Sequence, residues 1–278
     1  MGVLLAALSS LVYGTADFLG GFASKRTDGV VVTFVSQAFG CVVLAVALAV
    51  WPDVTVTAGD IWWGVAGGIG AGVGLMFFYP ALADGPMSVV APTTALCGAI
   101  VPLVVGITLG ERPSVPAMCG VLMALPAIVL VAHERDAGVA GVRRSTVLHA
   151  VLAGVGFGAF FVCLSRADSA AGLWPLVGAR VGSLGLLAIV LILTRRRIDV
   201  APGSWGLVIA VGSGDMVANS LYVLAVGRGL LSVIAVIGSM YPASTVILAQ
   251  VFLGERMQRA QVVGLALAGA ALALVAIG

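Results

Sequence analysis

Ten apolar segments follow one another along the sequence, and each is long enough to cross a lipid bilayer as a helix. Segments of roughly 18 to 25 residues span about 30 Å of hydrocarbon at 1.5 Å per residue. A backbone in lipid must satisfy its own hydrogen bonds, and the alternating strands of a membrane barrel are absent from the sequence. We therefore predict an all-α polytopic membrane protein with ten transmembrane helices. Their approximate bounds are 3–23, 29–51, 61–83, 86–109, 115–132, 146–165, 170–194, 203–226, 230–253 and 260–277.

Composition agrees with this interpretation. Only 9% of the residues are charged and 61% are hydrophobic, whereas about 25% of the residues in soluble domains are charged. The formal net charge of +2 indicates no nucleic-acid partner. The lipid bilayer is the predicted surrounding of the chain, and a bacterial cytoplasmic (inner) membrane is the predicted location.

A repeat relates the two halves of the chain at a constant offset of 144 residues. The motif GER starts at 110 and again at 254, and the 56 residues from 77 align without a gap onto those from 221 with 16 identities. Because five is odd, the second five-helix copy must enter the membrane from the opposite face. Inverted repeats of this kind are common in secondary transporters, with the binding site between the halves. The predicted units are two repeats, 1–132 and 146–278, and a polar linker, 133–145.

Three stretches of the chain resemble the EamA branch of the drug/metabolite transporter superfamily. They are LVYGTADFLGG at 11–21, PLVGARVGSLGLLAIVL at 175–191 and YPASTVILAQVFLGERMQRAQVVGLALAGAALALV at 241–275. The resemblance implies a ten-helix basket that exports or exchanges small metabolites or drugs by alternating access. It implies no particular substrate, because the superfamily carries amino acids, sugars, nucleotide sugars, drugs and lipids. Gly98 stands where the second half has Pro242, and Gln37 where the family often has arginine, so the halves differ chemically.

Formal charges occur well inside the apolar segments at Asp17, Arg180 and Asp215. A charge at the bilayer centre costs about 2.5 to 3.5 kcal/mol, so such residues usually face a partner or an aqueous cavity. Arg180 and Asp215 lie at similar depth on consecutive segments, which predicts an ion pair that flanks the substrate or clamps the fold. A zwitterionic substrate could open this pair. Other polar and aromatic side chains are predicted to complete the substrate-binding site, namely Tyr13, Gln37, Tyr79, Asn219, Tyr222 and Tyr241.

Asp17 is the candidate for proton coupling. No basic residue lies in its own segment. Burial without a partner disfavours the ionised carboxylate, so we predict that Asp17 binds and releases a proton as access alternates. Uncoupled exchange is the alternative.

Prolines inside the segments predict places where helices bend. Each removes a backbone hydrogen bond. Pro92 and Pro102 in one repeat and Pro242 in the other are the predicted gates, and static kinks are the alternative. Pro175 is predicted to bend its segment in the same way.

No pattern of residues indicates an enzyme, a metal site or a cofactor. GxSxG, HExxH and CxxC are absent, and GVGFGA at 154–159 follows no strand, so it predicts helix packing rather than nucleotide binding. The chain is therefore predicted to be a transporter of a small-molecule substrate, with protons as a further ligand, acting as a monomer or homodimer. A lipid-carrier flippase of the same architecture and an intramembrane enzyme are the alternatives.

The repeated GER is predicted to end two helices at a membrane surface. Gly110 and Gly254 suit a helix C-terminus, and Glu111 and Glu255 are expected among the headgroups. Lysine and arginine in the loops are concentrated on the side away from the termini, ten against three. Both termini are therefore predicted to lie outside the cytoplasm.

Overall fold

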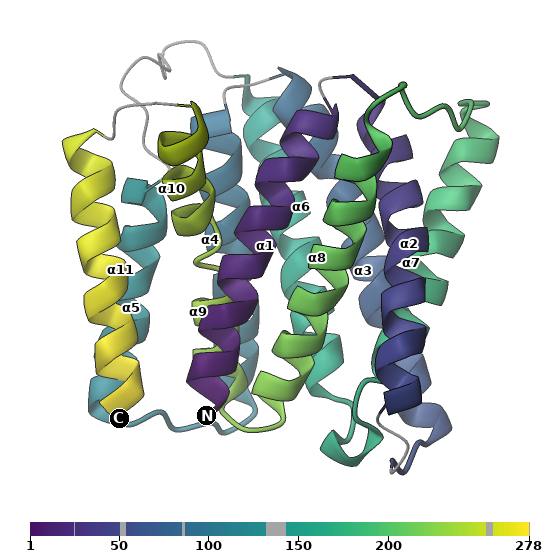
Figure 1. Cartoon of the computed structure of the whole chain (residues 1–278). Coiled ribbons are helices and arrows are strands. Elements are labelled where there is room, and N and C mark those ends of the chain that lie inside the picture. The colour runs from purple at the N-terminus through teal and green to yellow at the C-terminus, as the bar shows by residue number, and fades with distance from the viewer. Residues whose placement is uncertain (25, 51–53, 85–86, 132–142, 254–257, 278) are drawn as a thin grey trace.

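The computed structural model describes residues 1–278 except 25, 51–53, 85–86, 132–142, 254–257 and 278. Also outside the described part are the side chains of 79, 80, 82–89, 91, 92, 246, 249, 250 and 253. The described part is all-helical (Figure 1). Its helices are α1 (Gly2–Ser24), α2 (Gly29–Val50), α3 (Ala58–Asp84), α4 (Met87–Thr108), α5 (Val115–Val131), α6 (Arg144–Ser165), the short 3-10 helix η1 (Ser169–Ala171), α7 (Pro175–Leu193), α8 (Trp205–Val226), α9 (Leu231–Gly238), α10 (Pro242–Leu253) and α11 (Arg259–Ile277).

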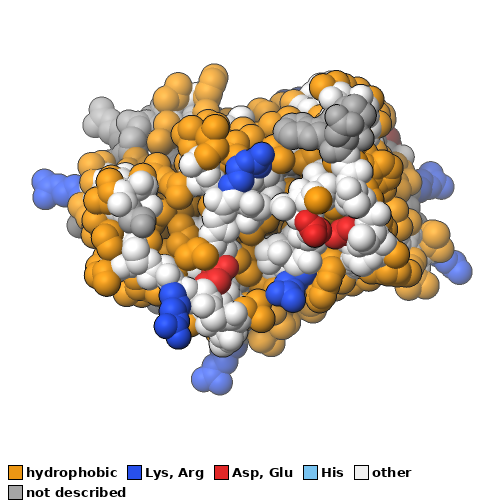
Figure 2. Space-filling model, turned by 90° about the horizontal axis from the view of Figure 1, so that it is seen from below, with side chains coloured by type: hydrophobic (Ala, Val, Ile, Leu, Met, Phe, Trp, Pro, Cys, Tyr) orange, Lys and Arg blue, Asp and Glu red, His pale blue; other side chains and the backbone are white. Residues whose placement is uncertain are grey.

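The outer surface of the bundle suits lipid. Within the described residues, seven helices are long and apolar enough to cross a bilayer, and three shorter apolar helices accompany them. Large hydrophobic side chains are exposed on the outside, such as Val46 on α2 and Ile192 on α7. Trp62 and Trp63 lie exposed near the start of α3, and tryptophan is enriched near the ends of membrane helices, where it meets lipid headgroups. Seen from the end that carries both termini, hydrophobic side chains form most of the rim (Figure 2).

The main helix contacts join the two halves of the chain. α3 packs against α6 and α7, α8 packs against α1 and α2, and α5 packs against α11. Glycine permits the closest of these approaches. A Cβ atom on Gly156 of α6 would lie 2.7 Å from the Gly70 carbonyl oxygen and 2.7 Å from the Gly74 nitrogen, both on α3. The GVGFGA stretch therefore serves helix packing, as predicted.

Gly156→Val is expected to lower stability, because two extra methyl groups and a Cβ would force α3 and α6 apart. Overpacking of this kind costs about 1 to 3 kcal/mol. The matched control is Gly185→Val on α7, where an added Cβ would meet nothing within 4 Å. Thermal unfolding in detergent should show a clear loss for the first variant and little change for the second. Equal losses would show that glycine content, not this contact, limits stability.

The segment predicted as one helix over 230–253 is broken in the structure. α9 ends at Gly238, and three residues in turn geometry precede Pro242, the first residue of α10. Pro242 thus begins a helix, where its missing N–H is not needed. The same holds for Pro175, which occupies the first turn of α7, so the expected bend there is wrong. Pro102 and Pro92 both fall inside α4, and the Pro92 side chain lies outside the described part.

The first GER motif ends a helix, as predicted, but its glutamate is not left free in the turn. α4 ends at Thr108, and Gly110 has a φ of +94°, which favours glycine. The Glu111 carboxylate accepts hydrogen bonds from the backbone N–H groups of Leu231 and Ser232 instead. Glu255 of the second motif lies outside the described residues.

Candidate functional site

A cavity of about 180 Å³ lies between helices of both halves. Its polar lining includes Tyr13, Asp17, Gln37 and Thr94 from the first half and Arg180, Ser183, Asp215, Asn219, Ser239 and Tyr241 from the second. Its aromatic lining includes Phe78, Phe157, Phe160 and Phe161. A cavity with apolar walls and a few convergent polar groups is typical of small-molecule binding sites.

The predicted ion pair between Arg180 and Asp215 is present. Arg180 lies near the start of α7 and Asp215 in the middle of α8, and the guanidinium Nη2 donates to the carboxylate Oδ2. The side chains are 11% and 32% exposed, respectively, so the pair is largely removed from water but open toward the cavity. The two charges compensate each other at a depth where either alone would be costly.

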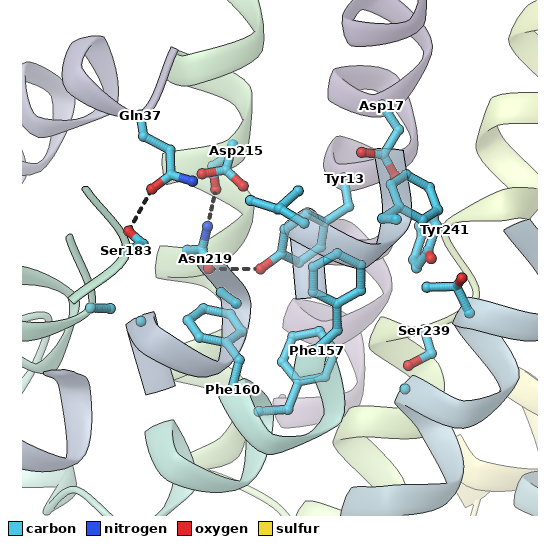
Figure 3. Close-up of a pocket in the computed structure, with 18 of the residues that line it drawn as sticks. Tyr13, Asp17, Gln37, Phe157, Phe160, Ser183, Asp215, Asn219, Ser239 and Tyr241 are labelled. Carbon is cyan, nitrogen blue, oxygen red and sulfur yellow. Dashed lines mark hydrogen bonds between the residues drawn. The ribbon is translucent and has the colours of Figure 1, made fainter. Parts of the chain in front are cut away.

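Hydrogen bonds tie the cavity wall of one half to that of the other (Figure 3). The Tyr13 hydroxyl on α1 donates to the Asn219 side-chain oxygen over 2.8 Å, and the Asn219 amide donates to the Asp215 backbone carbonyl over 2.7 Å. Beside this group, the Ser183 hydroxyl on α7 donates to the Gln37 side-chain oxygen on α2 over 2.5 Å. The side chains of three predicted site residues, Tyr13, Gln37 and Asn219, are therefore held in place around one space.

Asp17 contributes a second carboxylate to the cavity. It lies inside α1, and its surface is accessible from the cavity that it lines. Figure 3 shows it near the Tyr241 ring, away from the Asp215 group. Among the described residues, no hydrogen bond or ion pair to Asp17 is found. This carboxylate is therefore accessible to a proton or to a cationic group from the cavity.

One of the predicted residues, Tyr222, stands apart from this arrangement. Tyr222 is fully buried, its ring lies 4.4 Å from that of Phe161, and its hydroxyl donates to the Phe161 carbonyl over 3.4 Å. It supports the aromatic wall from behind rather than lining the cavity. The side chain of Tyr79 lies outside the described part of the chain.

The aromatic wall and Ser183 were not predicted from the sequence. Phe157, Phe160 and Phe161 occur on α6 at spacings of three and four residues, which places them on one helical face. In a sequence this apolar, phenylalanines that face a cavity cannot be told from those that face lipid. The position of Ser183 in the sequence could have indicated its place in the cavity wall, because Ser183 lies one helical turn after Arg180.

Comparison with known proteins decides the family. A model of the EamA-like transporter family matches residues 1–132 and again residues 144–277. The chain belongs to the EamA-like transporter family. A search of curated proteins found no match. A solved structure described only as "Crystal structure of protein" is similar in fold, with a TM-score of 0.83 and 20% identity, over 99% of this chain and 96% of that one.

Membership in the EamA-like transporter family gives the cavity a context. The chain is an integral membrane protein of a family of transporters. No group of three or more His, Cys, Asp or Glu side chains within the described residues is placed to hold a metal ion. The cavity offers one ion pair, one further carboxylate, hydroxyl and amide groups, and an aromatic wall. These groups can bind a solute through charge, hydrogen bonds and ring contacts.

Proposed function

We propose that this EamA-like protein is a secondary transporter that exports or exchanges small organic metabolites or drugs by alternating access, coupled to protons through Asp17. The observation that carries the proposal is the cavity lined by polar and aromatic groups from both halves of the chain. Substrate binding at such a place would let relative movement of the halves change the side from which it is reached. Its location would be a bacterial cytoplasmic membrane with both termini outside the cytoplasm.

The proposal includes ten membrane crossings arranged as two inverted five-helix repeats. The offset of 144 residues pairs α1 with α6, α2 with α7 and α3 with α8. The packing of α3 on α6 and α7 then corresponds to the packing of α8 on α1 and α2. In Figure 1, α1 rises from the end that carries both termini, whereas α6 descends toward it. Both observations support a two-fold relation between the halves.

The residues that line the cavity favour an amphiphilic solute, and a single chain supplies all of these residues. Phe157 and Phe160 suit an apolar or aromatic body, whereas Arg180, Asp215 and Asn219 suit polar ends. A zwitterion could place its carboxylate on Arg180 and its amine on Asp215. All of these groups come from one chain, so a monomer has a complete cavity, and a homodimer would hold two.

A lipid-carrier flippase is the second candidate, because a shallow apolar groove lies between α2 and α7. The groove is lined by Cys41, Leu44, Ala45, Leu48, Val177, Arg180, Val181 and Leu184. Arg180 contacts both this groove and the central cavity. An amphiphile could therefore reach the ion pair sideways from the bilayer.

Reconstitution into liposomes tests the proposal. Solutes that raise the melting temperature of the purified protein would be offered as radiolabelled substrates under an imposed pH gradient. We expect saturable uptake and accumulation above the external concentration, absent from protein-free liposomes. Equilibration without accumulation would contradict coupled transport. Exposure of fluorescent lipid headgroups, without solute uptake, would favour the flippase.

A further inference from the structure

One end of α9 is held by a carboxylate from the other half of the chain. After α4 ends, the turn at Gly110 directs Glu111 back toward the bundle. Its two oxygens accept hydrogen bonds from the backbone N–H groups of Leu231, over 2.7 Å, and Ser232, over 2.8 Å. These are the first residues of α9. A carboxylate accepts stronger hydrogen bonds than a neutral group and suits the positive end of a helix. Glu111 therefore caps a helix that begins 120 residues later.

The space around this cap leaves no room for a side chain at Gly106. A Cβ atom on Gly106 would lie 3.0 Å from the Glu111 carboxyl carbon and 3.0 Å from the Ser232 nitrogen. A glycine two residues before the end of α4 thus lets the carboxylate reach α9. The Ser232 hydroxyl is buried beside the cap and has no hydrogen-bond partner among the described residues. A buried hydroxyl without a partner costs free energy, so the capped arrangement is less stable than its two hydrogen bonds alone would make it.

α9 connects the cap to the cavity. All eight of its residues are buried, and it packs against α1, α4 and α5. Its start lies toward the end of the molecule that carries both termini, which we call the terminus face (Figure 1). Its other end is the break before Pro242, where Ser239 and Tyr241 line the cavity. A movement of the capped end would therefore change the cavity wall through one short, tightly packed helix.

We propose that Glu111 is a positioning residue that holds α9 against the first half and keeps the cavity closed toward the terminus face. Release of this cap frees α9 and opens the cavity to that face. The proposal rests on the alternating access proposed above, since a carrier needs two states of similar free energy. It gives the first GER motif a role in gating rather than only in ending a helix.

Cysteine labelling tests this role without any substrate. Ser239→Cys, in a background without the four native cysteines, places a thiol at the cavity end of α9. A membrane-impermeant maleimide is added to one side of oriented vesicles. Glu111→Gln keeps one acceptor but turns an NH2 group toward a backbone N–H. We expect at least about tenfold faster labelling from the terminus face, equivalent to about 1.4 kcal/mol, and slower labelling from the opposite face.

Two further variants separate gating from loss of structure. Arg112→Gln changes an exposed charge in the same turn and should leave labelling unchanged. Gly106→Ala crowds the same cap without altering Glu111 and should accelerate labelling from the terminus face. Unchanged labelling in both Glu111→Gln and Gly106→Ala, or equal acceleration from both faces, would overturn the proposal. If labelling accelerates from the terminus face alone but the protein moves no solute, Glu111 still acts as a gate, and the proposed transport function is wrong instead.

Discussion

Reversing the charges of Arg180 and Asp215 together is expected to restore the folding that either reversal alone removes. Arg180→Asp would place two carboxylates in contact, and Asp215→Arg two cations, in a largely buried site. An uncompensated buried charge costs about 3 to 5 kcal/mol, so each single variant should lose at least about a hundredfold in folded, active protein. The double variant regains a compensated pair. The measurements are the yield of monodisperse protein, its melting temperature and solute uptake.

The outcome of the double variant separates the roles of the pair. Recovery of folding and uptake would indicate a structural pair, whereas recovery of folding alone would show that the orientation of the charges also serves the substrate. Simply additive losses would contradict an energetic contact between the two residues. The matched control is the exposed pair of Arg196 and Asp28, which joins the halves over 2.6 Å with side chains 46% and 44% exposed. Its reversal should change stability little, because exposed pairs contribute about 0 to 1 kcal/mol.

Asp17→Asn is expected to abolish accumulation driven by a pH gradient while leaving exchange of labelled for unlabelled solute intact. Asparagine keeps the size and polarity of the side chain but cannot bind and release a proton. With one proton per solute, a gradient of one pH unit supports about tenfold accumulation. The variant should reach about the external concentration only. Uptake into liposomes with and without the gradient measures the difference.

The control for Asp17→Asn is Thr15→Ala on the same helix. The Thr15 hydroxyl is exposed and bonds its own backbone at Leu11 over 2.8 Å, and Thr15 is not among the residues that line the cavity. Its removal should change neither accumulation nor exchange. If Asp17→Asn accumulates solute as the native protein does, Asp17 is not the coupling group. If exchange is lost as well, the carboxylate serves substrate binding rather than coupling alone.

Much of the architecture could be predicted because lipid imposes simple rules. Length and apolarity located every long helix to within a few residues at most ends, and the doubled motif indicated the two matched halves. The break at 239–241 was not predicted, because the apolar residues around it, such as Ile237 and Met240, look like those of a continuous span. Only Pro242 marked the place, and a proline predicts a bend and the start of a helix equally well.

The candidate site, like the fold, could be predicted from the sequence only in part. Charges within an apolar segment are costly enough to stand out, which is why Arg180 and Asp215 could be paired from their depths alone. The cap formed by Glu111 could not be found in this way. Its partners are backbone N–H groups of Leu231 and Ser232, and backbone groups carry no residue-specific pattern in the sequence.

The charge balance of the cavity bears on how membrane voltage acts on the protein. Among the described residues that line the cavity, Arg180 and Asp215 cancel, so Asp17 alone decides the net charge. With Asp17 protonated the cavity is neutral, and with Asp17 ionised it carries one negative charge. A full elementary charge moved across 100 mV corresponds to about 2.3 kcal/mol. For a neutral solute, voltage would therefore act on the step in which the cavity reorients with Asp17 ionised, and the proton-loaded step would be electrically silent.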